Sequence, residues 1–444
     1  MISDHHGRTA GRATLLVRAV DDILGTHRTG EAVLISLTLC SVDAVATSPV
    51  KPDQLSTSDI REGNVVKITR LLRERGALTR AELVRSSGLT RPTVMAIVQR
   101  LLADGLVTES GQLRGSATGG RPGSLLHFRS QARVVAAVRW WRGTHIEAVL
   151  ADVAGNVLVR SLAPRVPETL GWTSLVTSFA GQIRDLHQAN PELGPLASIA
   201  VSLPGSVDRT HGLWTLPRRP AWHDLPLGDT LAEAAGVPVA VVNVVAAALI
   251  GQLSRQPAHA PSAALVYVAK GVGAAATVNG RLIDGATGSA GELGHCTLSG
   301  VDQRCRCGRH GCVEAVTSSL YLRREYRRIT GRTAPPTLAE METTGNDDVL
   351  DMLETAASRL ALATSWLVNI LNPAVLYFGG NAFTHGASVF PDRFTRDLRA
   401  AAHQPNARDL TMLPAHPDAT IAGGIQVASE LLPDALRPAL RVVR

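Results

Sequence analysis

One histidine and three cysteines lie close together in the segment GELGHCTLSGVDQRCRCGRHGCVEAV, residues 291–316. His295, Cys305, Cys307 and Cys312 form a Cys₃His set, which is typical of a closed tetrahedral zinc site with a structural role. A catalytic zinc would keep one position open for water, and four good ligands leave none. The sequence therefore predicts a structural Zn²⁺ on these residues, with buried thiols that hold no metal as the alternative.

The other cysteines and the hydropathy of the chain indicate a compartment. Of the five cysteines, four lie within residues 296–312, including Cys296, which we treat as a spare thiol, and Cys40 stands alone. A secreted disulfide framework would spread cysteines along the chain, whereas this cluster favours metal in a reducing compartment. The most apolar run, residues 32–46, is shorter than the about 18 residues that a membrane span needs and carries Asp43. We therefore expect a cytoplasmic protein without a membrane segment.

The positive charge of the chain is concentrated in one segment. Residues 64–130 contain eleven Lys or Arg and four Asp or Glu, a net charge of +7. The whole protein also has a formal net charge of +7, so the remaining residues sum to zero. A basic segment joined to a neutral body indicates a polyanionic partner, and nucleic acid is the first expectation.

Three short helices are expected in this basic segment. Apolar residues recur at helical spacing in residues 65–72, which predicts the first helix. Thr79 and Glu82 have the spacing of a capping box at the start of the second. Thr90 is placed to cap the third, with Pro92 near its start, where no N–H is needed. Three helices joined by tight turns are typical of a helix-turn-helix.

The third helix has an apolar face and a polar face, and we expect the polar face to read DNA. Its residues Arg91, Thr93 and Gln99 are predicted to contact bases in the major groove of a double-stranded operator. The following segment, LVTES…GGRPGSLLHF, predicts a β-hairpin wing, and its Arg121 is expected to enter the minor groove. The alternative is a small helical bundle whose basic face is only solvated.

The rest of the chain alternates between β-rich runs and helical stretches. Runs such as VVAAVRWW, HIEAVLAD, AALVYVAK and AVLYFGG are separated by helical segments, which indicates α/β architecture with helices covering the sheets. Nearly 300 residues of this kind suggest two lobes. The expected divisions are an extension without order (residues 1–61), a winged helix-turn-helix domain (62–130) and a body (131–444) with lobes at 131–243 plus the C-terminal helix and at 244–424.

Several of these motifs together resemble the ROK family. The helix-turn-helix followed by GGRP, then LPGSVD, SAGELGHCTL, CRCGRHGCVEAV and NPAVLYFGG, resemble its transcriptional regulators of the N-acetylglucosamine- and xylose-repressor type. The resemblance runs from about Ser58 to the C-terminus. The family contains sugar kinases with an actin-like, two-lobed fold and repressors that fuse a winged helix to the same body. The resemblance therefore implies an actin-like α/β body and leaves kinase and repressor to be distinguished.

The resemblance also implies a sugar site. In the family, the Glu and His of the Glu-x-Gly-His element and the Glu after the last Cys contact sugar hydroxyls, and here these are Glu292, His295 and Glu314. His295 would bind zinc through one ring nitrogen and offer the other to the sugar. Asn243 stands at the Asn position of an Asn-Asp pair that contributes to the same site in the kinases. The implied ligand is a sugar or a sugar phosphate.

The groups that perform phosphoryl transfer in the kinases are altered. Val244 stands where the kinases have the Asp that accepts the proton of the sugar hydroxyl. In the stretch aligned with the first phosphate loop, Trp140 replaces the Asp and Arg142 replaces the first Gly, and we expect Arg142 to pair with an effector phosphate. The second loop, KGVGAAATVNG, lacks its third glycine. We therefore expect no enzymatic activity.

The resulting prediction is a repressor of carbohydrate genes that responds to a sugar or sugar phosphate. A homodimer or homotetramer would place its winged helices on a palindromic operator. The resemblance implies that sugar binding closes the lobes and changes the spacing of the two helices. An ATP-dependent sugar kinase and a regulator that needs no ligand remain the alternatives.

Overall fold

The computed structural model describes most of the chain from residue 57 onward. The described residues are 57–112, 124–141, 145–163, 170–216, 219, 221–255, 262–333, 337–383 and 386–437. Cys40 and the apolar run at residues 32–46 lie outside them, as do the predicted site residues Arg121 and Arg142. None of the described helices is long and apolar enough to span a bilayer.

The N-terminal part of the described chain is a winged helix-turn-helix domain, as predicted. Its elements are α2 (Thr57–Arg75), β1 (Leu78–Thr79), α3 (Arg80–Ser87), α4 (Arg91–Ala103), β2 (Val107–Gln112) and β3 (Ser124–Phe128), and the antiparallel sheet has the order β1-β3-β2. The assignment of residues 57–61 to an unordered extension was wrong, because they form the first turns of α2. Ile60 and Arg61 are exposed, so these two residues show no apolar periodicity that would predict the start of the helix.

Local capping explains where the second and third helices begin. Thr79 Oγ1 accepts from the backbone N of Glu82 at 3.2 Å, and Glu82 Oε2 accepts from the backbone N of Thr79 at 2.7 Å. The predicted capping box is therefore confirmed. Thr90 Oγ1 caps α4 by accepting from the N of Thr93 at 3.4 Å. The helices bury one shared apolar core against the wing, formed by Ile68, Leu72, Leu83, Val94, Ile97, Val98, Leu101 and Leu126.

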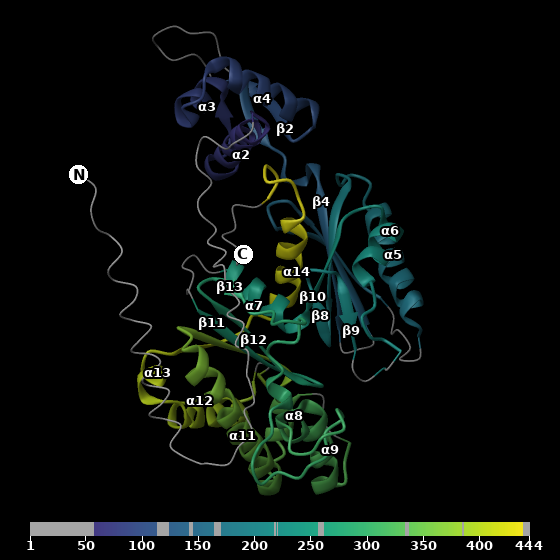
Figure 1. The fold of residues 1–444 in the computed structure, drawn as a ribbon, viewed down its shortest axis with the longest axis vertical. Helices are drawn as coiled ribbons and strands as arrows, with labels where there is room; N and C mark the ends of the chain where they lie inside the picture. The colour runs from purple at the N-terminus through teal and green to yellow at the C-terminus, as the bar shows by residue number, and fades with distance from the viewer. Residues whose placement is uncertain are drawn as a thin grey trace, which may run out of the picture. The chain divides into compact units, whose positions relative to one another are not determined.

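The first lobe of the body is built on a five-stranded sheet with helices on both faces (Figure 1). The strand order is β10-β7-β4-β5-β6, with β4 parallel to β7 and antiparallel to β5. The strands are β4 (Val134–Trp141), β5 (His145–Asp152), β6 (Val157–Leu162), β7 (Leu196–Leu203) and β10 (Val239–Asn243). Helices α5 (Trp172–Gln188) and α6 (Leu227–Ala235) cover one face, and α14 (Ala419–Glu430) covers the other. A two-stranded ribbon of β8 (Ser206–Asp208) and β9 (Leu213–Thr215) follows β7.

The second lobe repeats this layered plan. Its sheet has the order β13-β12-β11-β14-β15 and comprises β11 (Ala263–Val268), β12 (Val272–Val278), β13 (Arg281–Leu282), β14 (Val375–Gly380) and β15 (Thr411–Pro414). Helix α7 (Val244–Ser254) packs on one face. The largest apolar core lies on the other face and includes α8 (Val313–Thr317), α9 (Ser319–Thr330), α10 (Leu338–Glu342), α11 (Asp347–Leu371), α12 (Val389–Ala401) and α13 (Gln404–Arg408). The predicted two-lobed α/β body is confirmed.

Helices α7 and α14 are in backbone contact where they cross (Figure 1). A Cβ on Gly251 would lie 1.9 Å from the carbonyl oxygen of Ala419, and one on Gly423 would lie 1.8 Å from that of Ala247. Only glycine allows this approach at either position. The crossing fixes the direction of α7, whose first residue follows Asn243.

Candidate nucleic-acid interface and metal centre

Helix α4 presents an exposed row that is suited to a DNA groove. Arg91, Met95 and Gln99 follow one another at intervals of four residues and are all exposed, while the opposite side of the helix is buried. Thr93 lies off this row, and its hydroxyl is 2.8 Å from that of Thr90 at the cap. The structure therefore brings Arg91 and Gln99 together on one face and gives Thr93 a place at the helix start. Arg121 cannot be placed on this face, since it lies outside the described residues.

Arg80, one of the arginines of the basic segment, binds to both strands of the wing. Arg80, at the start of α3, pairs with Glu109 on β2 and donates to Ser124 Oγ on β3 at 3.1 Å. Ser124 Oγ in turn donates to Glu109 at 3.1 Å. The hydrogen bond from Arg80 lowers the pKa of Glu109. Arg80 was counted in the charge surplus of the sequence, but its charge is matched within the domain.

The four predicted metal ligands meet at one point in the second lobe. Their ligand atoms all lie within 4.8 Å of one another. His295 Nδ1 is 3.8 Å from Cys305 Sγ, and the Sγ atoms of Cys307 and Cys312 are 3.7 Å apart. A tetrahedral zinc with Zn–S bonds of about 2.3 Å requires ligand separations of about 3.8 Å. The donor set and its spacing therefore fit Zn²⁺.

The ligands are positioned by residues 295–312, a compact folded segment that we call the knuckle. Isolated β-bridges join Thr297 to Cys312 and Arg304 to His310, which folds the segment back on itself. Gly311 has a φ of +77°, and a Cβ there would lie 2.7 Å from the carbonyl oxygen of Val301. Glycine is therefore required immediately before the last cysteine.

The thiols of the knuckle differ in their affinity for protons. Burial raises the pKa of Cys312 to about 12 and also raises the pKa of Cys305. Burial also acts to raise the pKa of Cys307, but hydrogen bonds from Arg309 and the neighbouring thiols outweigh it and lower the value to about 6. Cysteine binds metal as thiolate, so the two buried thiols need the charge of a cation to ionise at neutral pH.

His295 connects the metal ligands to a carboxylate. Its Nδ1 faces Cys305, whereas its Nε2 lies 3.8 Å from Glu292 Oε2. Burial raises the pKa of Glu292. The nearby His295 acts to lower this pKa, and the negative charge of Glu314 acts to raise it further. The predicted arrangement, with one ring nitrogen toward the metal and the other toward a ligand, is compatible with this geometry.

Glu314 is buried, and both of its oxygens have protein partners. Arg306 Nη2 donates to Oε1 at 2.9 Å, and the backbone N of Val272 donates to Oε2 at 3.1 Å. Arg306 Nη2 also reaches the carbonyl oxygen of Lys270 at 2.8 Å. A Cβ on Gly271 would lie 2.7 Å from Glu314 Oε2. The knuckle is thereby joined to the glycine loop between β11 and β12, and no sequence pattern indicated that Arg306 makes this connection.

Asn243 caps α7 and holds the loop after β7. Its Oδ1 accepts from the backbone N of Val245 at 2.7 Å, and its Nδ2 donates to the carbonyl oxygen of Gly205 at 2.8 Å. Val244 follows as the first residue of α7 and is half-buried. The family resemblance predicts the base of a kinase at this position, but the side chain is an isopropyl group, which cannot accept a proton.

Trp140, which the family resemblance aligns with the Asp of the first phosphate loop, belongs to an apolar core. Trp140 is 5% exposed, and its ring centroid lies 5.7 Å from that of Trp214 and 6.1 Å from that of Trp222. On the opposite face of the sheet, Arg139 forms a buried ion pair with Glu147. The two other tryptophans come from the region around β9, and sequence spacing could not associate them with residue 140.

Comparison with known proteins identifies both parts of the chain. Residues 141–424 match the profile of the ROK family, and residues 63–108 match that of winged helix-turn-helix DNA-binding domains. The chain is 29% identical over 264 residues to the DNA-binding transcriptional repressor Mlc of Escherichia coli (strain K12), covering 58% of this chain and 64% of Mlc, just under two thirds of that relative. It is also 28% identical over 266 residues to a glucokinase of Thermotoga maritima, covering 56% of this chain and 82% of the kinase.

The fold is shared with a solved structure described as a ROK family transcriptional regulator, a homolog of the E. coli MLC protein. The TM-score is 0.67 at 22% identity, and the match covers 85% of this chain and 98% of the other. An actin-like ROK body preceded by a winged helix-turn-helix domain is therefore confirmed.

Proposed function

Because the chain belongs to the ROK family and carries a winged helix-turn-helix domain, we propose that it is a DNA-binding transcriptional repressor of carbohydrate genes. The exposed row Arg91, Met95 and Gln99 on α4 is the observation that carries this proposal. A recognition helix of this kind enters the major groove and reads base edges, while basic residues around it contact phosphates. Such a regulator acts in the cytoplasm, where free thiols stay reduced. It would bind a palindromic operator as a homodimer.

The body is proposed to bind a sugar without transferring phosphate to it. Phosphoryl transfer needs a group that accepts the hydroxyl proton and backbone N–H groups free to face phosphate. Val244 cannot accept a proton, and Trp140 is packed inside an apolar core. The backbone N–H of Val272, in the second glycine loop, donates to Glu314. These three features argue against the kinase alternative that the glucokinase relative raises.

The effector site is proposed to lie beside the metal. Zn²⁺ on His295 and the three cysteines would hold the thiolates and fix the orientation of the imidazole. The Nε2 of His295 and the carboxylate of Glu292 then face one ligand, and sugar hydroxyls suit both groups. Glu314 and Asn243 would shape the same site through the loops that they hold. A sugar or sugar phosphate is the ligand class that we propose.

DNA selection tests the regulatory proposal. Purified protein should enrich a palindromic sequence from fragmented genomic DNA. Arg91→Ala with Gln99→Ala should lose that sequence preference, because each bidentate base contact contributes about 1–3 kcal/mol of discrimination. An Arg184→Ala variant, at an exposed position on α5 outside the winged helix-turn-helix domain, serves as the control and should keep the preference. Enrichment of the same sequence by the double variant would contradict the assignment of α4 as the reading helix.

A second experiment separates the regulator from the kinase. Thermal unfolding measured with a panel of sugars and sugar phosphates should show stabilisation by at least one, since binding to the folded state alone raises its stability. ADP release from ATP with the same sugars should remain absent. Turnover of any sugar would overturn the non-enzymatic part of the proposal, and absence of stabilisation by all of them would favour a regulator without an effector.

A further inference from the structure

A second basic surface lies in the second lobe, distant in sequence from the winged helix. Residues 302–332 contain eight arginines, no lysine and three acids, a net charge of +5. The rest of the body, residues 131–301 and 333–444, has a net charge of −3, so the positive charge of the body is concentrated in this segment. The arginines are Arg304, Arg306, Arg309, Arg323, Arg324, Arg327, Arg328 and Arg332. A local excess of positive charge of this size attracts an anionic binding partner.

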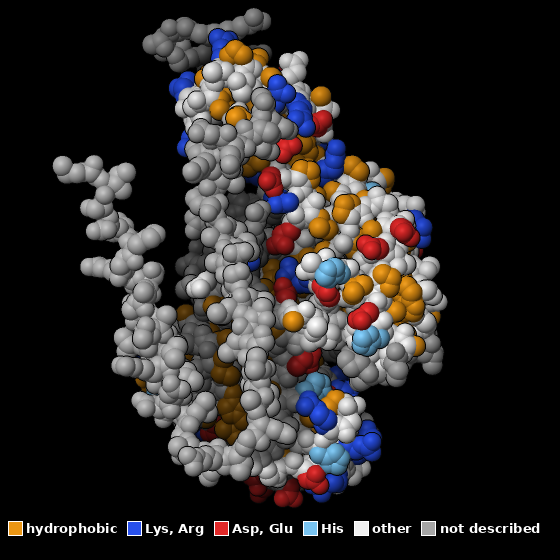
Figure 2. Space-filling model, in the orientation of Figure 1, with side chains coloured by type: hydrophobic (Ala, Val, Ile, Leu, Met, Phe, Trp, Pro, Cys, Tyr) orange, Lys and Arg blue, Asp and Glu red, His pale blue; other side chains and the backbone are white. Residues whose placement is uncertain are grey.

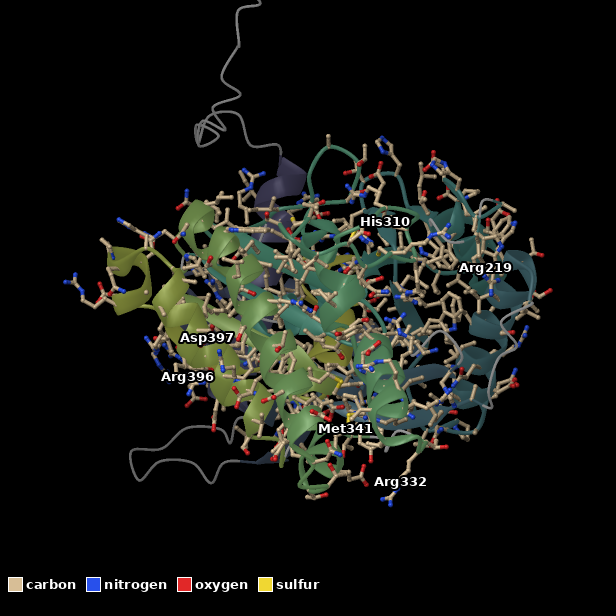
Figure 3. The ribbon with its side chains drawn as sticks, turned by 90° about the horizontal axis from the view of Figure 1, so that it is seen from below. Arg219, His310, Arg332, Met341, Arg396 and Asp397 are labelled. Carbon is tan, nitrogen blue, oxygen red and sulfur yellow. The ribbon has the colours of Figure 1, made fainter. Side chains whose placement is uncertain are left out.

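The surface is centred on α9. Leu322 and Tyr326 anchor the inner side of this helix in the core, which leaves Arg324, Arg327 and Arg328 exposed on the outer side. Lys and Arg side chains gather at the lower right of the molecule in Figure 2, where Figure 1 places α8 and α9. Arg332, just beyond the end of α9, extends away from the ribbon in Figure 3.

The charges of this surface are only partly matched within the protein. Glu325 is the one acid of α9, and it accepts from Arg328 Nε at 2.6 Å and from Arg324 Nε at 3.4 Å. Within α9 one carboxylate thus stands beside the exposed Arg324, Arg327 and Arg328, and Asp348 adds a weaker attraction on Arg328. Arg327 and Arg328 also lie in the last turn, where cations favour the helix dipole, but the dipole amounts to only about half a charge. Helix stability therefore does not account for the whole cluster.

We propose that the α9 surface is a second contact for the phosphate backbone of duplex DNA, independent of sequence. Guanidinium groups match phosphate oxygens in pairs, and every cation of the segment is arginine. Arg324 and Arg328 are separated by about 6 Å along the helix axis, a spacing at which long side chains reach neighbouring phosphates. The surface offers little apolar area, chiefly Leu320 at 37% exposure. Protein–protein interfaces have an apolar centre, whereas DNA interfaces are polar and strongly positive.

The salt dependence of binding to random-sequence duplex DNA tests this contact. The full chain is compared with a variant carrying Arg324→Gln, Arg327→Gln and Arg328→Gln, using sonicated duplex DNA between about 50 and 200 mM salt. Each phosphate contact contributes about 0.9 to the slope of log affinity against log salt, so the slope should fall by about 2–3. The affinity at the lowest salt should fall about tenfold.

A charge-matched control lies on another part of the same lobe. Arg396→Gln, Arg399→Gln and Arg408→Gln remove the same charge from exposed positions on α12 and α13 and should leave the slope unchanged. Equal losses in both variants would mean that only net charge matters, which would overturn the proposal. So would an unchanged slope in the α9 variant at an unchanged melting temperature, and an acidic protein would then be the partner to seek. If the wild-type chain fails to bind random DNA but still enriches a palindromic sequence, the α9 contact is refuted and the proposed function stands.

Discussion

The two sides of the proposed effector site are built from opposite kinds of residues. The knuckle side is polar, with His295 and Glu292 facing one another and Glu314 held by Arg306 and a backbone N–H. The side that is proposed to correspond to the phosphoryl-transfer site of a kinase contains the half-buried Val244 and the buried Trp140. Polar groups that orient a ligand are present, and groups that move a proton or meet a phosphate are replaced by hydrocarbon. The difference teaches that binding and chemistry depend on separate elements of this fold.

The largest effect should come from the knuckle side, through its metal. Cys312→Ser replaces a fully buried ligand with a weak one, and structural zinc contributes about 10–16 kcal/mol to small zinc domains. We expect loss of bound zinc and a loss of stability of about 5 kcal/mol or more. Zinc content by mass spectrometry and thermal unfolding measure both. Cys296→Ser is the matched control, one residue from His295, and should retain the metal. A Cys312→Ser protein that keeps full zinc content would break the ligand assignment.

On the opposite side of the proposed site, replacing Trp140 with the Asp expected in a kinase should destabilise the protein. It should not produce sugar kinase activity. Trp140→Ala leaves a cavity between Trp214 and Trp222, and truncation of a buried aromatic costs about 3–5 kcal/mol. Trp140→Asp adds an unpaired charge to the same core and should cost more. Chemical denaturation measures the difference, with Trp366→Ala at a half-buried position as control. A stable Trp140→Asp protein would show that residue 140 tolerates a charge and is not part of the core. That result would favour the kinase alternative.

Local features of the fold were predictable because nearby residues determine them. The capping box of Thr79 and Glu82 is complete within four residues, so the start of α3 could be read directly. The strand β12 could not be predicted from its own residues, since GAAATV has little intrinsic preference for strand and contains glycine. Its conformation is decided by pairing with β11 along the whole length, which a single segment does not reveal.

In the candidate site, too, residues close together in the sequence could be predicted, whereas contacts between distant segments could not. The four residues of the candidate metal cluster lie within eighteen residues and their chemistry is specific, so they could be named before the structure. No role was predicted for Arg306, which lies between two cysteines and joins the knuckle to the loop at Lys270. Contacts of this kind, like the packing of Trp140 on Trp214, join segments far apart in the chain and follow from the tertiary fold.

The ion pair of Glu314 should produce an intermediate effect. Arg306→Met leaves the carboxylate of Glu314 buried without its cation. Because Arg306 is 36% exposed, solvent screens the pair, and we expect a loss of about 1–2 kcal/mol in unfolding experiments. Combining Arg306→Met with Glu314→Gln should recover part of the loss, since the buried charge is then absent. Arg304→Met, two residues away and exposed, is the control. Equal losses of stability in the Arg306→Met and Arg304→Met variants would show that the ion pair with Glu314 contributes nothing to stability.

The smallest effect concerns the polar network on the first lobe. A hydrogen bond from Arg160 at 3.1 Å lowers the pKa of Asp418, which precedes α14. A carboxyl whose pKa is lower in the folded state contributes stability above its ordinary pKa near 4, and this contribution is lost as the pH falls through the lowered value. Asp418→Asn should therefore reduce stability at pH 7 by less than about 1 kcal/mol, since both partners are over a third exposed. The difference between variant and wild type should vanish at strongly acidic pH. A difference that persists there would assign the effect to packing at the start of α14 instead of charge.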